Sequence, residues 1–359
     1  AWLEVESTLP AREQRTAQRL HEALCLEGYT GAVDAVQRHV RAFARRRHPS
    51  TTAFIPQSFA SGEAYQFDWS HEHVELGGIE QVVKVAHVRL CHSRVFFLAA
   101  YPRESQEMVF DSHARAFEFF GGVPRRGIYD NLKPAVDAIF VGRQRRYNRR
   151  FLVMCNHYLI EPTACTPASG WEKGQVENQV GNVREWLFTP KVRCADLAEL
   201  NAHLAARCLQ LARERAHPEQ TQRKIIELWD EERADLRAMP IPFDGYAEKS
   251  ALVSTTCLVG FDRNRYSVES RYVRQVATVR AYAERIIIVC DGEVAGEHPR
   301  CFERGQTLYN PWHYVAALAR KPGALRNGAP FKDWNLPGSM TRLRERLARH
   351  ADGDRQFVD

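Results

Sequence analysis

The chain has 359 residues, of which 44% are hydrophobic and 26% charged, so it is long enough to form about two to four domains with apolar cores. It contains no apolar run near the roughly 20 residues of a membrane span, and its first residues lack the basic start and apolar core of a signal peptide. The formal charge of +6 is too mild to indicate a nucleic-acid partner by itself.

The nine cysteines are scattered and form no Cys-x-x-Cys motif. An odd number of isolated thiols favours a reducing cytoplasm over a disulfide framework or a zinc site. We therefore expect a cytoplasmic protein without a membrane partner.

Residues 11–26 and 32–47 both show helical spacing of apolar residues, and a short turn that contains glycine separates them. This arrangement is typical of a helix-turn-helix. The outward positions of the second helix include Gln37, Arg38, Arg41 and Arg45. Such side chains contact base edges and phosphates, so the arginines favour DNA binding over an ordinary helical hairpin. We expect a helix-turn-helix domain over residues 1–47 and a linker over residues 48–63.

Residue 64 begins a stretch of short apolar strands that later alternate with helices. The first three strands can pair as an antiparallel meander, and the two later ones fit a parallel extension of the same sheet. A long helix is predicted over about residues 171–188. The sequence therefore indicates a multidomain α/β protein with a mixed five-stranded sheet and its helices over residues 64–190.

The remaining chain divides into three parts by its pattern. Residues 191–240 read as a helical segment. Residues 241–305 contain short alternating strands with turns, which suits a small five-stranded β-barrel. Residues 306–359 read as a helical tail.

Three acidic residues of the middle part occupy positions that call for an explanation. Asp68 lies within the first strand, Asp130 ends the fourth, and Glu177 lies on the long helix. A carboxylate within an apolar strand is costly unless it is paired or binds a metal. If the sheet brings all three together, they form the oxygen-rich site that Mg²⁺ prefers. Taken singly, Asp130 also fits a turn or cap, and Glu177 an ordinary exposed helix residue.

The sequence around these acids resembles the IstA-type DDE transposases of the insertion-sequence-21 family, within the ribonuclease-H-like transposases and integrases. "GEAYQFDW" carries Asp68, "YDNLKPAV" carries Asp130, and "KGQVENQVGNVREWLF" carries Glu177. The stretch "EGYTGAVDAVQRHVR" resembles the family's helix-turn-helix. Glu177 follows Asp130 by 47 positions, which exceeds the spacing that gave retroviral integrases their name.

The resemblance implies a ribonuclease-H-like catalytic domain in which Asp68, Asp130 and Glu177 hold two Mg²⁺ ions, with Mn²⁺ as an alternative. It implies a transposase that binds the ends of a mobile element, cleaves DNA to free 3′-OH ends and joins them to target DNA. The implied partners are the terminal inverted repeats, target DNA, further copies of the chain in a dimer or tetramer, and an AAA+ ATPase helper. The implied location is the bacterial cytoplasm, with action at the nucleoid.

Further basic residues are candidate DNA contacts. They are Arg143, Arg145 and Arg146 in an arginine run, Lys173 one turn before Glu177, and Arg184 on the same predicted helix. For the arginine run and Lys173, an exposed and solvated surface is the alternative. Two other functions stay open: a DNA-binding regulator with an inactive ribonuclease-H-like domain, and a nuclease without strand transfer.

Overall fold

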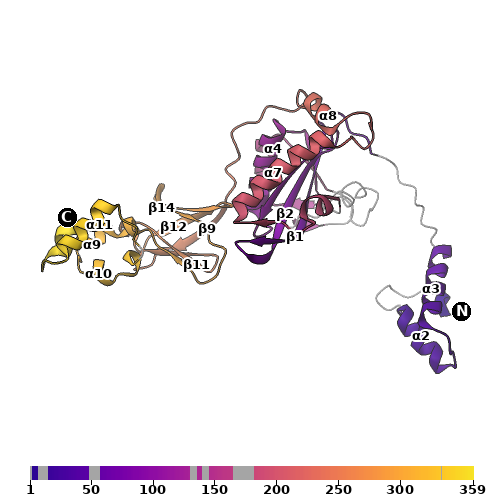
Figure 1. The fold of residues 1–359 in the computed structure, drawn as a ribbon, viewed down its shortest axis with the longest axis horizontal. Helices are drawn as coiled ribbons and strands as arrows, with labels where there is room; N and C mark the ends of the chain where they lie inside the picture. The colour runs from indigo at the N-terminus through magenta and orange to yellow at the C-terminus, as the bar shows by residue number, and fades with distance from the viewer. Residues whose placement is uncertain are drawn as a thin grey trace. The chain divides into compact units, whose positions relative to one another are not determined.

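The computed structural model contains two compact units, residues 1–57 and residues 58–359 (Figure 1). The described residues are 2–6, 15–47, 57–129, 136–139, 145–164, 182–332 and 334–359.

The first unit contains three helices, α1 (Trp2–Glu6), α2 (Ala17–Leu26) and α3 (Val33–Arg47). The Thr16 side chain caps α2 by accepting a 3.3 Å hydrogen bond from the backbone N–H of Arg19. After α2, Gly28 takes a φ of +94°, a left-handed backbone conformation that glycine adopts without strain. The second predicted helix is confirmed, and the first is present from Ala17 instead of residue 11, with residues 11–14 outside the described residues. The helix-turn-helix geometry is not confirmed.

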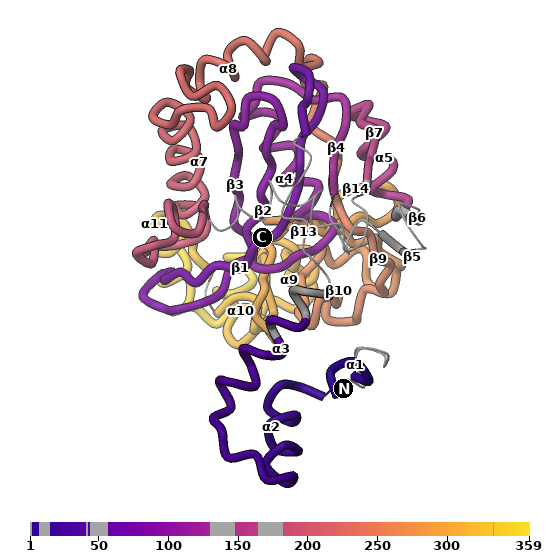
Figure 2. Tube along the Cα trace, turned by 90° about the vertical axis from the view of Figure 1, so that its right-hand side faces the viewer, coloured from indigo at the N-terminus to yellow at the C-terminus, as the bar shows by residue number. Residues whose placement is uncertain are grey.

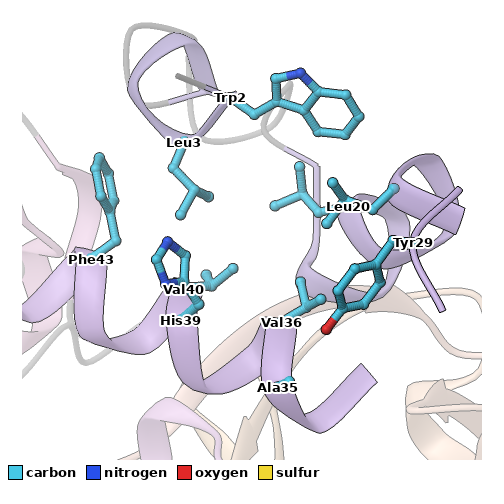
Figure 3. Close-up of a pocket in the computed structure, with 10 residues that line it drawn as sticks. Trp2, Leu3, Leu20, Tyr29, Ala35, Val36, His39, Val40 and Phe43 are labelled. Atoms are coloured by element: carbon cyan, nitrogen blue, oxygen red, sulfur yellow. The ribbon is translucent and has the colours of Figure 1, made fainter. Parts of the chain in front are cut away.

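Apolar side chains from all three helices of this unit face one another around a cavity of about 470 Å³ (Figure 3). Leu3 of α1 and Leu20 of α2 lie opposite Val36, Val40 and Phe43 of α3. The apolar stripe of the second predicted helix therefore faces the interior of the unit.

The second unit begins with a mixed sheet whose strands follow the order β3-β2-β1-β4-β7. These strands are β1 (Ala64–Leu76), β2 (Ile79–Leu90), β3 (Phe96–Tyr101), β4 (Arg126–Tyr129) and β7 (Glu161–Ala164). The pairs β1–β2 and β2–β3 are antiparallel, whereas β1–β4 and β4–β7 are parallel. The predicted mixed sheet is confirmed, and the short strand β8 (Arg193–Cys194) adds a sixth member beside β1.

Helices cover both faces of this sheet, because alternate residues of its strands point to opposite faces and apolar side chains occur on both. Tyr65 and Phe67 of β1 pack with α4 (Gln106–Phe120), α5 (Arg149–His157) and α8 (Ile225–Glu232) on one face. The opposite face packs against α7 (Leu197–Glu214) and helical residues 182–188. In Figure 2, α7 lies beside β3 at one end of the sheet, and α5 lies beside β7 at the other.

The side-chain amide of one residue forms hydrogen bonds with the backbone of the edge strand β3, as a neighbouring strand would. Asn201 of α7 accepts a 2.6 Å hydrogen bond from the Ala100 N–H and donates a 3.0 Å bond to the Ala100 carbonyl. This occupies polar backbone groups that an exposed edge would offer to another chain.

The arginine run after residue 142 is divided between two elements. Arg145–Tyr147 forms β6, which pairs antiparallel with β5 (Val136–Ile139), a hairpin that was not predicted. Arg150, at the start of α5, donates hydrogen bonds of 2.9 and 3.1 Å to the carbonyls of Asp244 and Tyr246. This arginine therefore anchors the segment that leads into the next group of strands.

Residues 247–308 form seven strands in two sheets instead of the predicted five-stranded barrel. The strands are β9 (Ala247–Leu252), β10 (Leu258–Phe261), β11 (Asn264–Ser267), β12 (Val276–Ala281), β13 (Arg285–Cys290), β14 (Glu293–Pro299) and β15 (Thr307–Leu308). One sheet has the order β14-β13-β12-β9 and the other β10-β11-β15. The two share one apolar core, but their backbone hydrogen bonds close no ring within residues 247–308, so the barrel is not confirmed.

The chain ends in the predicted helical tail. Its elements are η3 (Pro311–Tyr314), α9 (Val315–Leu318), α10 (Ala324–Asn327), η4 (Ala329–Phe331), α11 (Gly338–Leu347) and α12 (Gly353–Val358), and the 3₁₀ turn η2 (Ser270–Tyr272) precedes β12. Leu318, Leu325 and Phe331 form a small core of their own.

Glu232 of α8 is a fully buried carboxylate that joins the residues just before β1 to the turn between β2 and β3. It accepts hydrogen bonds from the Gly62 N–H (3.1 Å) and the Ser93 N–H (2.9 Å). Buried N–H groups without a partner cost free energy, so this side chain holds the start of β1 against the β2–β3 turn.

We predict that Glu232→Ala lowers the free energy of unfolding by about 2–4 kcal/mol, because two buried N–H groups lose their acceptor. Thermal unfolding of the full chain measures the effect. Glu231→Ala is the matched control, since that neighbouring glutamate is exposed, and it should leave the midpoint almost unchanged. Equal midpoints for the two variants would contradict this role of Glu232.

Candidate active site

The parallel pairing of β1 and β4 determines which residues meet at the centre of the sheet. The pairing runs from Ala64 opposite Arg126 to Phe67 opposite Tyr129. The next residues in sequence are Asp68 on β1 and Asp130 after β4. Asp130 lies outside the described residues, so the structure defines the register up to one position before it.

Side chains on the face of the sheet that packs against α4 stabilise the β1–β4 register. The hydroxyls of Tyr65 and Tyr129 hydrogen-bond each other, and the His113 Nε2 lies 3.2 Å from the Tyr129 hydroxyl. Both tyrosines and His113 are buried. Burial holds the His113 pKa at about 4, so the imidazole is neutral at physiological pH. The two strands are therefore joined through side chains as well as through their backbones.

Gly127 of β4 leaves room for this tyrosine pair. A Cβ at this position would lie 2.6 Å from the Tyr129 hydroxyl and 2.7 Å from the Tyr65 hydroxyl. Because both rings are held in a close-packed core, the neighbouring atoms have little freedom to move away.

Asp68 belongs to a polar stripe on one face of β1. The stripe consists of Gln66, Asp68, Ser70 and Glu72, at alternate positions. Asp68 is half-buried, and its Oδ1 accepts a 2.8 Å hydrogen bond from the Trp69 N–H. The other three residues are buried. Such a row of polar groups inside a covered sheet is costly unless each group has a partner or a function.

His87 of β2 lies directly opposite Asp68 in the antiparallel register. Its Nε2 lies 2.8 Å from the Ser70 hydroxyl, and burial, with a smaller contribution from Arg184, lowers its pKa to about 3. The imidazole is therefore neutral at physiological pH. Its Nδ1 and the Gln66 Oε1 are buried polar atoms without a hydrogen-bond partner within the described ranges.

The aromatic neighbours of Asp68 point to the opposite face, as their alternate positions predict. Phe67 stacks on His113 with ring centroids 4.8 Å apart, and Trp69 packs edge-on against Tyr101 at 5.9 Å. This packing holds the backbone of β1 rigidly at the position of the acid.

Arg184 joins the helical residues 182–188 to the same polar stripe. Its Nε and Nη2 each donate a 2.9 Å hydrogen bond to the Glu72 carboxylate, and the arginine is about half exposed whereas Glu72 is almost fully buried. Arg184 was predicted as a DNA contact. In the structure its guanidinium has a protein partner.

The remaining predicted site residues are only partly described. Gln37 is half-buried and Arg38 exposed on α3, which also carries Arg41 and Arg45, whose side chains are not described. Arg145 and Arg146 lie in β6, again without described side chains. Asp130, Arg143, Lys173 and Glu177 lie outside the described residues. Within the described ranges, no group of three His, Cys, Asp or Glu side chains could hold a metal ion.

Known proteins with similar sequences identify the family. A transposase of Aminobacter aminovorans is 41% identical over 369 residues, which cover 100% of this chain and 72% of the relative. The transposase of insertion sequence element IS21 of Pseudomonas aeruginosa is 28% identical over 294 residues, or 80% of this chain and 73% of the relative. The chain belongs to the IS21-type transposases.

Two further comparisons concern parts of the fold. The Mu transposase C-terminal domain family matches residues 238–310 of the transposase, the region of the two small sheets. A solved intasome of simian T-cell lymphotropic virus, in complex with the PP2A regulatory subunit B56 gamma, is similar with a TM-score of 0.40 and 14% identity. That match covers 79% of this chain and 96% of the viral chain and is too weak to define the fold.

Membership of the IS21-type family makes the chain a transposase and therefore an enzyme. Among its described helices, none has the length and apolar character required to cross a membrane. The predicted family and enzyme class are thus confirmed.

The polar stripe was missed in the sequence, apart from Asp68. Glu72, Ser70 and His87 give no motif by themselves. The signal that could have found them is the alternation of aromatic residues at 65, 67 and 69 with polar residues at 66, 68 and 70. This indicates a strand with one apolar and one polar face.

We predict that Gly127→Ala lowers the free energy of unfolding by about 1–3 kcal/mol, because the added methyl group overpacks the tyrosine pair. Chemical denaturation of the full chain tests this. Gly260→Ala in β10 is the matched control, since a Cβ there meets no atom within 4 Å. A neutral or stabilising Gly127→Ala would show that the tyrosine pair does not fix the register.

Proposed function

We propose that the transposase binds the ends of a mobile element, hydrolyses a phosphodiester at each end to free a 3′-OH, and joins that end to target DNA. Asp68, Asp130 and Glu177 are the proposed catalytic acids. The observation that carries the proposal is the β1–β4 register, which ends at Phe67 and Tyr129, one residue before the first two acids.

Neighbouring strands lie about 4.8 Å apart, so a register continued by one residue would set the carboxylates of Asp68 and Asp130 side by side. Two adjacent carboxylates repel each other unless a proton or a cation neutralises them. The half-buried position of Asp68 strengthens this repulsion, because fewer water molecules screen it. The arrangement therefore favours a bound divalent cation.

The surroundings of Asp68 fit Mg²⁺, with Mn²⁺ as the alternative. Carboxylate oxygens are the ligands that such hard cations prefer. Opposite Asp68, His87 is neutral at physiological pH, so that imidazole does not compete as a positive charge. Asp68, Asp130 and Glu177 would hold two ions, which when bound activate the attacking oxygen and stabilise the leaving one.

Both chemical steps are displacements at phosphorus. In the first, a water oxygen bonds to phosphorus as the bond to the 3′-oxygen breaks, and the water loses a proton while the 3′-oxygen gains one. In the second, the oxygen of the 3′-OH bonds to a target phosphorus and loses its proton, while the bond to the target 3′-oxygen breaks and that oxygen gains a proton. Because a rigid site accelerates such in-line attack by orientation, the aromatic packing below β1 contributes through the placement of Asp68.

DNA contacts are proposed from the basic residues of both units. Gln37, Arg38, Arg41 and Arg45 on α3 would contact the terminal inverted repeats, with α1, α2 and α3 as a helix-turn-helix domain. Arg143, Arg145, Arg146 and Lys173 would contact phosphates near the catalytic acids. Arg184 is the weakest of these candidates, because Glu72 already engages its guanidinium.

Joining two ends of one element requires at least two copies of the chain, so a dimer or tetramer is proposed. The family further implies an AAA+ ATPase helper and action on DNA in the bacterial cytoplasm. These partners rest on membership of the IS21-type transposases.

We predict that Asp68→Asn abolishes Mg²⁺-dependent cleavage of element-end DNA while DNA affinity stays within about twofold of the wild type, since one metal ligand is lost and no proposed DNA contact changes. Cleavage gels and fluorescence anisotropy measure the two properties. Glu75→Gln, seven residues along the same strand, is the matched control and should cleave normally. Wild-type cleavage by Asp68→Asn would contradict the catalytic role of Asp68, whereas a wild-type chain that binds element-end DNA but never cleaves it would favour the regulator.

A second prediction separates the transposase from a nuclease without strand transfer. Pre-cut element ends with a free 3′-OH should be joined to target DNA by the wild-type chain, in the presence of any helper it requires, and not by Asp68→Asn, because both steps use the same acids. Joined products are scored on sequencing gels. Cleavage without any joining would leave only the nuclease.

A further inference from the structure

The Glu72–Arg184 ion pair offers an inference about how the third acid reaches the other two. The pair is bidentate, with two 2.9 Å hydrogen bonds, and its carboxylate is almost fully buried. A bidentate arginine–carboxylate contact fixes both the distance and the orientation of the segments it joins. Here it joins strand β1 to the helical residues 182–188.

Both partners lie on the elements that carry proposed catalytic acids. Glu72 is four residues after Asp68, and an even spacing on a strand places both on the same face. Arg184 is seven residues after Glu177. In a helix, which the sequence predicts from about Trp171 to Phe188, seven residues make two turns and return to the same face.

The lengths of the two spacings also agree. Four strand residues span about 13 Å, and seven helical residues span about 10 Å. A glutamate side chain can bridge the difference. If the helix runs along β1 in the same direction, an ion pair at Glu72 would therefore bring Glu177 to Asp68.

The described contacts support that direction. After Arg184 at Glu72, the chain continues to Val192, whose carbonyl accepts a 3.0 Å hydrogen bond from the Glu75 N–H. Arg193 then pairs in parallel with Glu75. Later residues of this segment thus lie further along β1, so earlier ones are expected toward Asp68.

We propose that Glu72 and Arg184 are positioning residues that set the register of the Glu177 helix along β1, and so complete the metal site without touching metal or substrate. This inference rests on the proposed function, because it assumes that Asp68 and Glu177 share the site. It assigns Arg184 a role in assembly of the active site in place of the predicted DNA contact.

The test is Mn²⁺ binding to the full chain, measured by electron paramagnetic resonance of the free ion. The main variant is the double substitution Glu72→Gln with Arg184→Ala, which keeps the net charge and leaves no unpaired buried carboxylate. We expect about tenfold weaker Mn²⁺ binding, the size of effect seen when groups that orient metal ligands are removed. DNA affinity should not change. Retained Mn²⁺ affinity in the double variant would overturn the proposal.

The single variant Arg184→Ala separates positioning from electrostatics and from DNA contact. Loss of the positive charge of Arg184 would by itself strengthen Mn²⁺ binding, whereas displacement of the helix that carries Glu177 would weaken it. Arg184→Lys, which keeps the charge but not the bidentate fork, should have an intermediate Mn²⁺ affinity. Reduced DNA affinity with unchanged Mn²⁺ binding would identify Arg184 as a DNA contact and contradict the positioning role.

Two controls complete the design. Arg193→Ala removes another arginine that pairs with β1, at 3.2 Å from Glu75, and should bind Mn²⁺ as the wild type does. Glu177→Gln should lose Mn²⁺ affinity outright. Wild-type Mn²⁺ binding by Glu177→Gln would overturn the proposed function itself, and this result is distinct from failure of the Arg184 variants alone.

Discussion

The parallel pairing of β1 with β4 is the constraint on which the rest of the site depends. A shift of one residue would turn every side chain of β1 to the other face of the sheet, and Asp68 would enter the aromatic core. The hydroxyl pair of Tyr65 and Tyr129 and the absence of a side chain at Gly127 stabilise the observed pairing. The position of Asp68 is therefore set by residues outside the proposed metal site.

Buried polar groups elsewhere in the transposase act in the same way. Glu232 holds the backbone at the start of β1, Asn201 covers the edge of β3, and Glu72 holds a helical segment through Arg184. Each is a polar side chain that reaches across a long sequence separation. Such contacts specify one arrangement, because any other arrangement leaves a buried polar group unpaired at a cost in free energy.

The sequence alone allowed the mixed sheet and its helices to be predicted, because strand and helix periodicities are local and strong in Val88, Phe97 and Phe117 and their neighbours. The predicted barrel is not confirmed, because the strands of this region form two small sheets. Alternation predicts strands there, but pairing such as β9 with β12 depends on distant residues. Asp68 could be singled out from its cost in an apolar strand, and its catalytic role stays a proposal, whereas the positions of Glu72 and His87 depend on the register of β1, β2 and the following helix.

The central claim is that Asp68, Asp130 and Glu177 together form one divalent-metal site. The most direct measurement replaces Mg²⁺ by Fe²⁺ and maps the backbone cuts made by hydroxyl radicals generated at the bound ion. The account predicts cuts clustered beside all three acids, suppressed by excess Mg²⁺ and absent in Asp68→Asn. Cuts confined to one acid, or clustered elsewhere in the chain, would contradict it.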